Sequence, residues 1–566
     1  MDTPDIHALA TMTTAEKIGQ LVLAGLPGPT LDADTAALFR ERHLGGVILF
    51  ARNIVDAAQT RTLTNAIQAA TALCAAGWPA LIGADQEGGR VLRTAALPEA
   101  IRWPAAMALG ATDDPALAER VSATLGAELR ALGINVAFAP DADVNANPLN
   151  PVIGTRSFGE SPARVADFVV ATLRGLASTR IAGTAKHFPG HGNTALDSHL
   201  ALPTIPHDLA YLRRVDLVPF AAAIAAGVPL IMTAHIRFPA LEPDGVPATL
   251  SRRILTGLLR EEMGYEGVTV SDAMTMQAIR DHYGIVAGCV QSIIAGADLV
   301  IPLDGQEGAV LDALLVAVAD GRLPGAQVDA SVRRILRLRR SLAASPEQPE
   351  HASTPSAFDV PAHHDNGAAL ARDVARRSVT VLAAPPGTLL LTTEQGGQGG
   401  QAGSAPAIAV AVVECLLGSA SEAEQVPDAA LPLLTAMRAR FPQARGAMLA
   451  AESPTDTQRA VAYALAADAD MLVIGTSDLA RFPRQVEAVA ALMQSARRVV
   501  VIAQRGPYDL GVLPPLPHVA LIATYGDSPD ALAAAVALIA GDTAPIGRLP
   551  VTVSTAFPRG SGMGRI

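Results

Sequence analysis

The chain has 566 residues, half of them apolar, and a formal net charge of −11 at neutral pH. This length exceeds what one hydrophobic core usually supports, since cores stop growing near roughly 250–300 residues, so two domains are expected. The acidic balance argues against nucleic-acid binding and against contact with an anionic membrane surface, because both need clustered lysine and arginine. A small ligand fits this composition better.

The N-terminal segment 1–24 has no basic region followed by an apolar one, and the chain lacks any uninterrupted apolar stretch of about 18 residues. We therefore expect a cytoplasmic protein without a membrane-spanning helix. Cys74, Cys289 and Cys415 lack CxxC spacing, so they are interpreted as buried free thiols rather than as a disulfide framework or a zinc site. The oligomeric state is left open.

Short apolar runs alternate with longer amphipathic segments between residues 18 and 302, a pattern typical of βα units. The candidate strands are 20–24, 46–50, 80–84, 136–140, 183–186, 230–234, 268–271 and 298–302. Eight strands are the number that a closed (β/α)8 barrel needs, and the barrel is expected to span residues 1–341.

Polar residues follow six of these strands at their C-terminal ends. They are Arg52 and Asn53, Asp85 to Glu87, Asp141 to Asn145, Lys186 and His187, His235, and Asp272. In a barrel these ends meet at one face, which holds the active site, whereas an open doubly wound sheet concentrates its ligands at one switch point. Contributions from six strands favour the closed barrel.

A second domain is expected after a linker at residues 342–366, which is rich in Ser, Pro, Glu, His and Ala. The domain would begin with a helix at 367–377. Its candidate strands are 378–383, 407–413, 471–474, 499–503 and 519–523, separated by Ala-rich helices. The predicted fold is therefore a TIM-type (β/α)8 barrel followed by a smaller α/β sandwich domain at 367–566.

The densest cluster of chemically active residues is the segment 186–199, KHFPGHGNTALDSH. In an extended loop, side chains two residues apart point the same way, so Asp197 can orient the imidazole of His199 and raise its basicity. This pairing predicts a general acid/base. A zinc site formed by His187, His191 and His199 is the alternative, but their spacing suits a helix, which the glycines and the proline disfavour. No metal is expected.

Asp272 directly follows the apolar run 268–271, where an aspartate can be either a catalytic carboxylate or the N-cap of a helix predicted at 274–280. Its proposed partner decides between these interpretations. A carboxylate at one strand end and the Asp197/His199 pair on another loop supply a nucleophile and a proton donor, the minimum for glycoside cleavage with retention.

Two further segments can bind a polyol. After the third strand, Asp85 can accept hydrogen bonds from two sugar hydroxyls and Arg93 can reach the same ring edge, while Glu87 and Arg90 are interpreted as a structural ion pair. After the fourth strand, Arg156 is the long donor of a loop shaped by prolines and Asx residues.

These segments resemble the bacterial β-N-acetylglucosaminidases of glycoside hydrolase family 3, over nearly the whole chain from EKIGQL at 16–21 to GRLPV at 547–551. The segment 186–199 is similar to the signature that separates these enzymes from the family's β-glucosidases, which take a glutamate from a later domain as acid/base. The resemblance implies that Asp272 is the nucleophile and that His199 with Asp197 forms the acid/base dyad on a mobile loop.

The resemblance also assigns the residues that hold N-acetylglucosamine in the −1 subsite. They are Asp85, Arg93, Arg156, Lys186 and His187. Two departures from the family pattern, Ala273 after the nucleophile and Asn193 in GHGNT, remove no residue with an assigned role. Muropeptide or chitin-derived substrates, a place in peptidoglycan recycling and the lack of a cofactor are implied as well.

The expected function is a retaining exo-β-N-acetylhexosaminidase that works through a glycosyl-aspartate intermediate. One alternative is a glycoside phosphorylase, because a neutral imidazole base does not repel an anionic acceptor. The other is a non-catalytic carbohydrate-binding protein.

Overall fold

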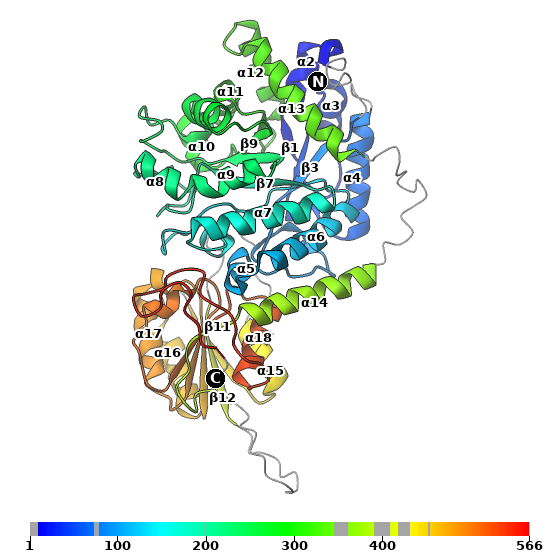
Figure 1. The fold of residues 1–566 in the computed structure, drawn as a ribbon. Helices are drawn as coiled ribbons and strands as arrows, with labels where there is room; N and C mark the ends of the chain where they lie inside the picture. Colours follow the sequence, from blue (N-terminus) through cyan, green and yellow to red (C-terminus); the bar gives the residue numbers. More distant parts are fainter. Residues whose placement is uncertain are drawn as a thin grey trace.

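The computed structural model describes residues 9–72, 78–198, 200–343, 360–389, 408–416, 431–450 and 453–564. His199, Cys74 and most of the expected linker lie outside these ranges. The described chain forms a barrel and a smaller α/β domain, with the long helix α14 (Val360–Ser378) along their boundary (Figure 1).

The larger body is an eight-stranded parallel sheet whose order in space equals the order in sequence. Its strands are β1 (Leu23–Gly25), β2 (Gly46–Leu49), β3 (Leu81–Ala84), β6 (Val136–Ala137), β7 (Ala182–Phe188), β8 (Leu230–Thr233), β9 (Val268–Ala273) and β10 (Leu299–Ile301). A parallel bridge between Val22 and Val300 joins the first and last strands. The predicted barrel is thus confirmed, and each expected strand is present within a few residues, because strands buried on both faces read as continuous apolar runs.

Helices surround this sheet, and shorter helical elements and a hairpin lie in the segments that connect them. The helices are α2 (Thr14–Gly19), α3 (Ala33–Arg42), α4 (Ala57–Ala72), α5 (Ala106–Thr112), α6 (Pro115–Ala131), α7 (Pro162–Ser178), α8 (Leu209–Arg214), α9 (Leu217–Ala225), α10 (Gln277–Tyr283), α11 (Ile285–Ala295), α12 (Glu307–Ala319) and α13 (Gly325–Leu342). The shorter elements are η1 (Ala51–Asn53), η2 (Arg93–Ala96), η3 (Gly154–Arg156), η4 (Ala248–Leu250), the π-helical η5 (Arg253–Glu262), and the hairpin strands β4 (Gln86–Gly88) and β5 (Val91–Leu92).

Helix α6 illustrates how local sequence sets these boundaries. Asp114 caps it by accepting a hydrogen bond from the backbone N–H of Leu117, and Pro115 occupies its first turn, where a missing N–H costs nothing. Leu117, Val121 and Leu125 recur every four residues and are buried against the barrel core.

The second domain is a six-stranded sheet between two layers of helices. Its strands are β11 (Thr380–Ala383), β12 (Val410–Leu416), β13 (Arg445–Ala450), β14 (Met471–Thr476), β15 (Val499–Ala503) and β16 (Val519–Ala523), in the order β11-β16-β15-β14-β12-β13. Only β11 is antiparallel to its neighbour. Residues of α16 (Asp456–Ala467) and α17 (Pro483–Met493) belong to one core, and those of α15 (Pro432–Arg440) and α18 (Pro529–Ile539) to the other.

Two elements of this domain differ from the sequence-based expectation. Helix α14 begins at Val360, inside the segment 342–366 that the composition assigned to the linker. Strand β13 was not predicted, because exposed and buried residues alternate along it and its apolar run is short.

The two domains share buried apolar contacts across their boundary. Met107, Ala108 and Ala111 of α5 belong to the same core cluster as Leu549 and Val551 of the second domain. The barrel therefore completes part of its neighbour's core.

No helix among the described residues combines the length and the apolar composition needed to cross a membrane. Cys289 and Cys415 are buried and free, which confirms their interpretation as thiols.

Candidate active site

A cavity of about 470 Å³ opens among the C-terminal ends of the barrel strands. Six of the residues predicted from the sequence line it together: Asp85, Arg93, Arg156, Lys186, His187 and Asp272. Ser198, which directly precedes His199 in the chain, lines the same cavity. Asp197, the residue before Ser198, is buried. His199 lies outside the described residues. The structure thus brings together six of the eight predicted residues and the attachment point of a seventh.

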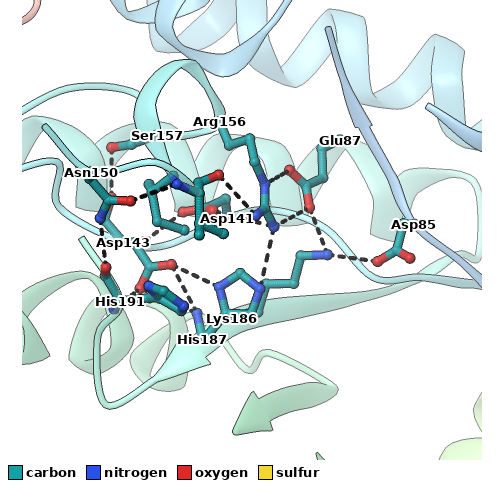
Figure 2. A network of polar contacts seen from close by, with 12 residues as sticks. Asp85, Glu87, Asp141, Asp143, Asn150, Arg156, Ser157, Lys186, His187 and His191 are labelled. Atoms are coloured by element: carbon teal, nitrogen blue, oxygen red, sulfur yellow. Dashed lines mark hydrogen bonds and ion pairs between the residues drawn. The ribbon is translucent and has the colours of Figure 1, made fainter. Parts of the chain in front are cut away.

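Lys186 is the central cation of the cavity wall (Figure 2). Strand β7 delivers its Nζ to within 2.8 Å of Asp85 Oδ1 and 2.7 Å of Glu87 Oε1. Arg93 Nη2 adds a contact of 3.1 Å to Asp85 Oδ2. Burial alone would raise the pKa of Asp85, but the Lys186 ammonium and the Arg93 guanidinium outweigh it and hold the pKa well below its usual range. Asp85 is therefore a permanent acceptor for hydroxyl groups.

Glu87 fixes the guanidinium of Arg156 by a two-pronged ion pair. Arg156 Nε donates to Glu87 Oε2 at 2.8 Å and Arg156 Nη2 to Glu87 Oε1 at 2.9 Å. The expected ion pair between Glu87 and Arg90 is wrong, because Arg90 instead contacts Asp527 of the second domain at 2.5 Å. Bidentate geometry fixes the plane of the Arg156 side chain, which η3 places at the cavity wall.

The side chain of Asp143 orients the imidazole ring of His187. The His187 Nδ1 lies 2.8 Å from Asp143 Oδ2, and the Nε2 lies 3.3 Å from Arg156 Nη2. Because a guanidinium can only donate, Nε2 must accept and Nδ1 carries the proton that is donated to Asp143. Asp143 and Arg156 together therefore select the neutral His187 tautomer that carries its proton on Nδ1.

Asp141 and Asp143 form a buried pair of carboxyl groups beneath this wall. Burial raises the pKa of both groups, and a neighbouring carboxylate adds to the effect, Glu87 for Asp141 and Asp141 for Asp143, so the pair retains a proton at higher pH than an exposed aspartate does. Their oxygens and one His187 nitrogen lie within 4.8 Å of one another, a spacing that could suit a metal ion. Arg156, however, contacts Asp141 at 3.8 Å and His187 at 3.3 Å, so a permanent positive charge already occupies the neighbourhood.

The loop after β7 is held by His191. Its Nε2 lies 2.9 Å from Ser198 Oγ, and its Nδ1 lies 3.1 Å from Thr194 Oγ1. The carbonyl of Asp197 accepts hydrogen bonds from the backbone N–H groups of Leu200 and Ala201. The expected extended conformation at 197–199 stays a prediction, because His199 lies outside the described residues. The pairing of Asp197 with His199 stays a prediction.

Asp272 stands at the end of β9, where its Oδ1 accepts a hydrogen bond from the backbone N–H of Ala273 at 2.7 Å. His235, after β8, supports the same corner. Its Nδ1 lies 2.8 Å from Thr249 Oγ1 and its Nε2 lies 3.1 Å from the carbonyl oxygen of Ala273. The carboxylate thus projects into the cavity from a backbone that a neighbouring strand holds in place.

Three residues that the sequence did not assign to catalysis or sugar binding belong to this constellation: Asp143, His191 and His235. Each follows a barrel strand, and that position was the available signal. Their partners could not be predicted, since His187 and Asp143 are 44 residues apart in the chain.

Residues 13–338 match the model of the glycosyl hydrolase family 3 N-terminal domain, which covers the whole barrel. The chain belongs to glycosyl hydrolase family 3. Its resemblance to this family is confirmed.

Similar proteins are known for the barrel and for the full arrangement of this family 3 member. The β-hexosaminidase A of Pseudoalteromonas piscicida is 39% identical over 338 residues, which are 56% of this chain and 56% of that protein. The chain thus spans about half the length of that relative. A family 3 β-N-acetylglucosaminidase from Paenibacillus sp. str. FPU-7 is 35% identical, with a TM-score of 0.84, over 96% of this chain and 99% of its own.

A β-N-acetylhexosaminidase from Beutenbergia cavernae DSM 12333 matches 58% of this chain with 99% of its own, at 30% identity and a TM-score of 0.55. Nearly the whole of that chain is thus matched by little more than half of this one.

Proposed function

We propose that the protein is a retaining exo-β-N-acetylhexosaminidase that releases terminal N-acetylglucosamine from cell-wall or chitin-derived saccharides. The observation that carries this proposal is that Asp272 and Ser198, the neighbour of His199, line one cavity. A carboxylate and a loop that bears an imidazole can then address the same glycosidic bond. The names of the similar proteins support the sugar specificity.

The proposed reaction is a double displacement. The Asp272 carboxylate attacks the anomeric carbon while the His199 imidazolium, oriented by Asp197, gives its proton to the leaving oxygen. The bond from the anomeric carbon to the aglycone breaks and a glycosyl-aspartate forms. The neutral imidazole then removes a proton from water, which attacks the anomeric carbon and releases Asp272 and the sugar with retained configuration.

The charged wall would hold the sugar for this attack. Asp85, kept ionised by Lys186 and Arg93, accepts hydrogen bonds from two ring hydroxyls. Arg156 offers donors in the plane that Glu87 fixes. Because these groups are already oriented before substrate binds, little free energy is lost in ordering them.

Initial rates on a panel of nitrophenyl β-glycosides, with and without phosphate, test the proposal. We expect the N-acetylglucosaminide to be turned over fastest, with free N-acetylglucosamine as product and no dependence on phosphate. Phosphate-dependent turnover that yields sugar 1-phosphate would establish the phosphorylase instead. Sugar binding without turnover would establish a non-catalytic binding protein.

The acid role of His199 has its own signature. The variant His199→Ala should lose far less activity on dinitrophenyl than on nitrophenyl or alkyl glycosides, because a good leaving group needs little protonation. Equal losses across this series would contradict the role.

A further inference from the structure

The loop of residues 138–161, between β6 and α7, carries Asp143 and Arg156 and is clamped by the second domain. At its C-terminal end, Glu160 accepts two hydrogen bonds from Thr552, each 2.7 Å long. A Cβ atom on Gly159 would lie 2.6 Å from the carbonyl oxygen of Pro550, so the two backbones touch where a side chain could not fit. This end of the loop is docked tightly.

Nearer its N-terminal end, the loop contacts the second domain through Asn145. Asn145, 1% exposed, donates from its Nδ2 to the hydroxyl of Tyr508 at 2.6 Å. Tyr508 belongs to η7 (Pro507–Gly511), which follows β15, and is 363 residues further along the chain. Burial raises the pKa of Tyr508, so its hydroxyl remains neutral and able to bond the amide.

Asn145 lies two residues from Asp143, and the backbone between them is constrained. Asn145 N donates to the Gly159 carbonyl at 3.0 Å, and Ser157 Oγ donates to the Asp143 carbonyl at 2.6 Å. The Asp143 carboxylate in turn accepts from the backbone N–H of His191 at 2.6 Å and orients His187. A displacement of Asn145 would therefore reach the cavity wall and the base of the loop that precedes His199.

We propose that Tyr508 of the second domain is a positioning residue for the barrel's active site, acting through Asn145 and Asp143 on His187 and His191. Among the described residues, Tyr508 is not part of the cavity lining, so it acts through these neighbours rather than by touching the sugar. The effect on catalysis rests on the proposed function. The geometric effect on the loop does not.

A control variant at a second buried tyrosine distinguishes an effect on loop position from a general loss of stability. Tyr525 is also buried in the second domain, and its hydroxyl donates at 2.7 Å to Oγ1 of Thr380 in β11 rather than to loop 138–161. Tyr508→Phe and Tyr525→Phe each remove one buried hydroxyl and keep the ring. Both should lower the thermal midpoint to a similar, small extent.

The kinetic test compares these variants on nitrophenyl N-acetyl-β-glucosaminide. We expect Tyr508→Phe to lower kcat/KM by about 10- to 100-fold, since small displacements of binding groups have effects of this order, and Tyr525→Phe to keep it within twofold. Tyr508→Phe with Asn145→Ala should lose no more than the larger single variant, because both act on one contact. Unchanged constants in Tyr508→Phe, equal losses in both tyrosine variants, or additive losses in the double variant would overturn the proposal.

Hydrogen exchange gives a readout that does not depend on activity. Amides of segments 138–161 and 186–198 should exchange faster in Tyr508→Phe than in the wild type, and at the wild-type rate in Tyr525→Phe. Identical protection in all three proteins would refute the positioning role. A wild type that cleaves no glycoside would instead refute the proposed function and leave the exchange result to decide on Tyr508.

Discussion

Strands of both sheets in this molecule end in charged residues, yet the surroundings of these residues differ. In the barrel, Asp85, Lys186 and Asp272 line open space. In the second domain, Glu414 at the end of β12 accepts the backbone N–H groups of Leu433 and Leu434, at 3.0 and 2.9 Å, and so caps α15. The same position in a strand thus lines a cavity in one sheet and caps a helix in the other.

The volume of a cavity does not by itself distinguish the barrel site from other cavities of the molecule. A cavity of about 560 Å³ lies between the two domains, larger than that of the barrel. Alanine and proline line much of it, together with Arg90, Arg102, Arg505 and Asp527. Arg90 and Asp527 contact each other at 2.5 Å, and Arg505 contacts Asp478 at 3.1 Å. A site of the barrel's kind needs both space and charges directed into that space.

The largest expected difference between the two sheets is seen when one carboxylate is removed from each. Asp272→Ala should lower kcat by at least about 10⁴-fold, since no other group supplies the nucleophile. Glu414→Gln should leave kcat within twofold and lower stability by about 1–3 kcal/mol through the weakened cap. Steady-state kinetics and urea unfolding measure both effects. Wild-type activity in Asp272→Ala would end the nucleophile assignment.

A second comparison uses the chain's two lysines, Lys17 and Lys186. Lys186→Met leaves Asp85 and Glu87 without their shared cation, so we expect kcat/KM to fall about 10²- to 10³-fold and stability to fall by about 3–5 kcal/mol. Lys17→Met removes only a surface ion pair and should change stability by less than about 1 kcal/mol. Similar behaviour of the two variants would show that the charged wall contributes little.

The smallest effect concerns a buried carboxyl group that belongs to neither set of strand ends. Glu128 of α6 accepts a hydrogen bond from Trp103 Nε1 at 2.7 Å, and burial raises its pKa to about 7. The folded state therefore binds a proton more tightly than the unfolded state, whose glutamate titrates near ~4.3, and this stability is lost as the pH rises from about 4 to 7.

Glu128→Gln stays neutral at every pH and keeps an acceptor for Trp103. We expect it to match the wild type near pH 4 and to exceed its stability by about 1–3 kcal/mol at pH 8. Urea unfolding at both pH values checks this difference. A constant offset between the two proteins across the range would contradict the raised pKa.

The sequence was sufficient for the barrel because its strands are buried on both sides and are followed by polar residues. It was sufficient for Lys186 and Asp272 for the same reason, since a strand end fixes where a side chain emerges. Strand β13 escaped prediction because its half-exposed face lacks the continuous apolar signal.

Pairings between distant segments could not be predicted from local pattern. Glu87 contacts Arg156, 69 residues away, whereas the expected partner Arg90 was chosen for its closeness in sequence. Tyr508 gave no local signal, because its contact with Asn145 depends on how the two domains pack against each other. Such contacts follow from tertiary packing, which a periodicity of 2 or 3.6 residues does not encode.

Helix α5 has a consequence for how the protein is made. Met107, Ala108 and Ala111 pack with residues near the C-terminal end, so during synthesis these contacts form only after the ribosome has added more than 400 residues beyond α5. At about 5–20 residues per second this delay lasts on the order of 20–90 s. Throughout that interval this part of α5 lacks its apolar partners from the second domain, and chaperones that bind exposed apolar patches would bind there.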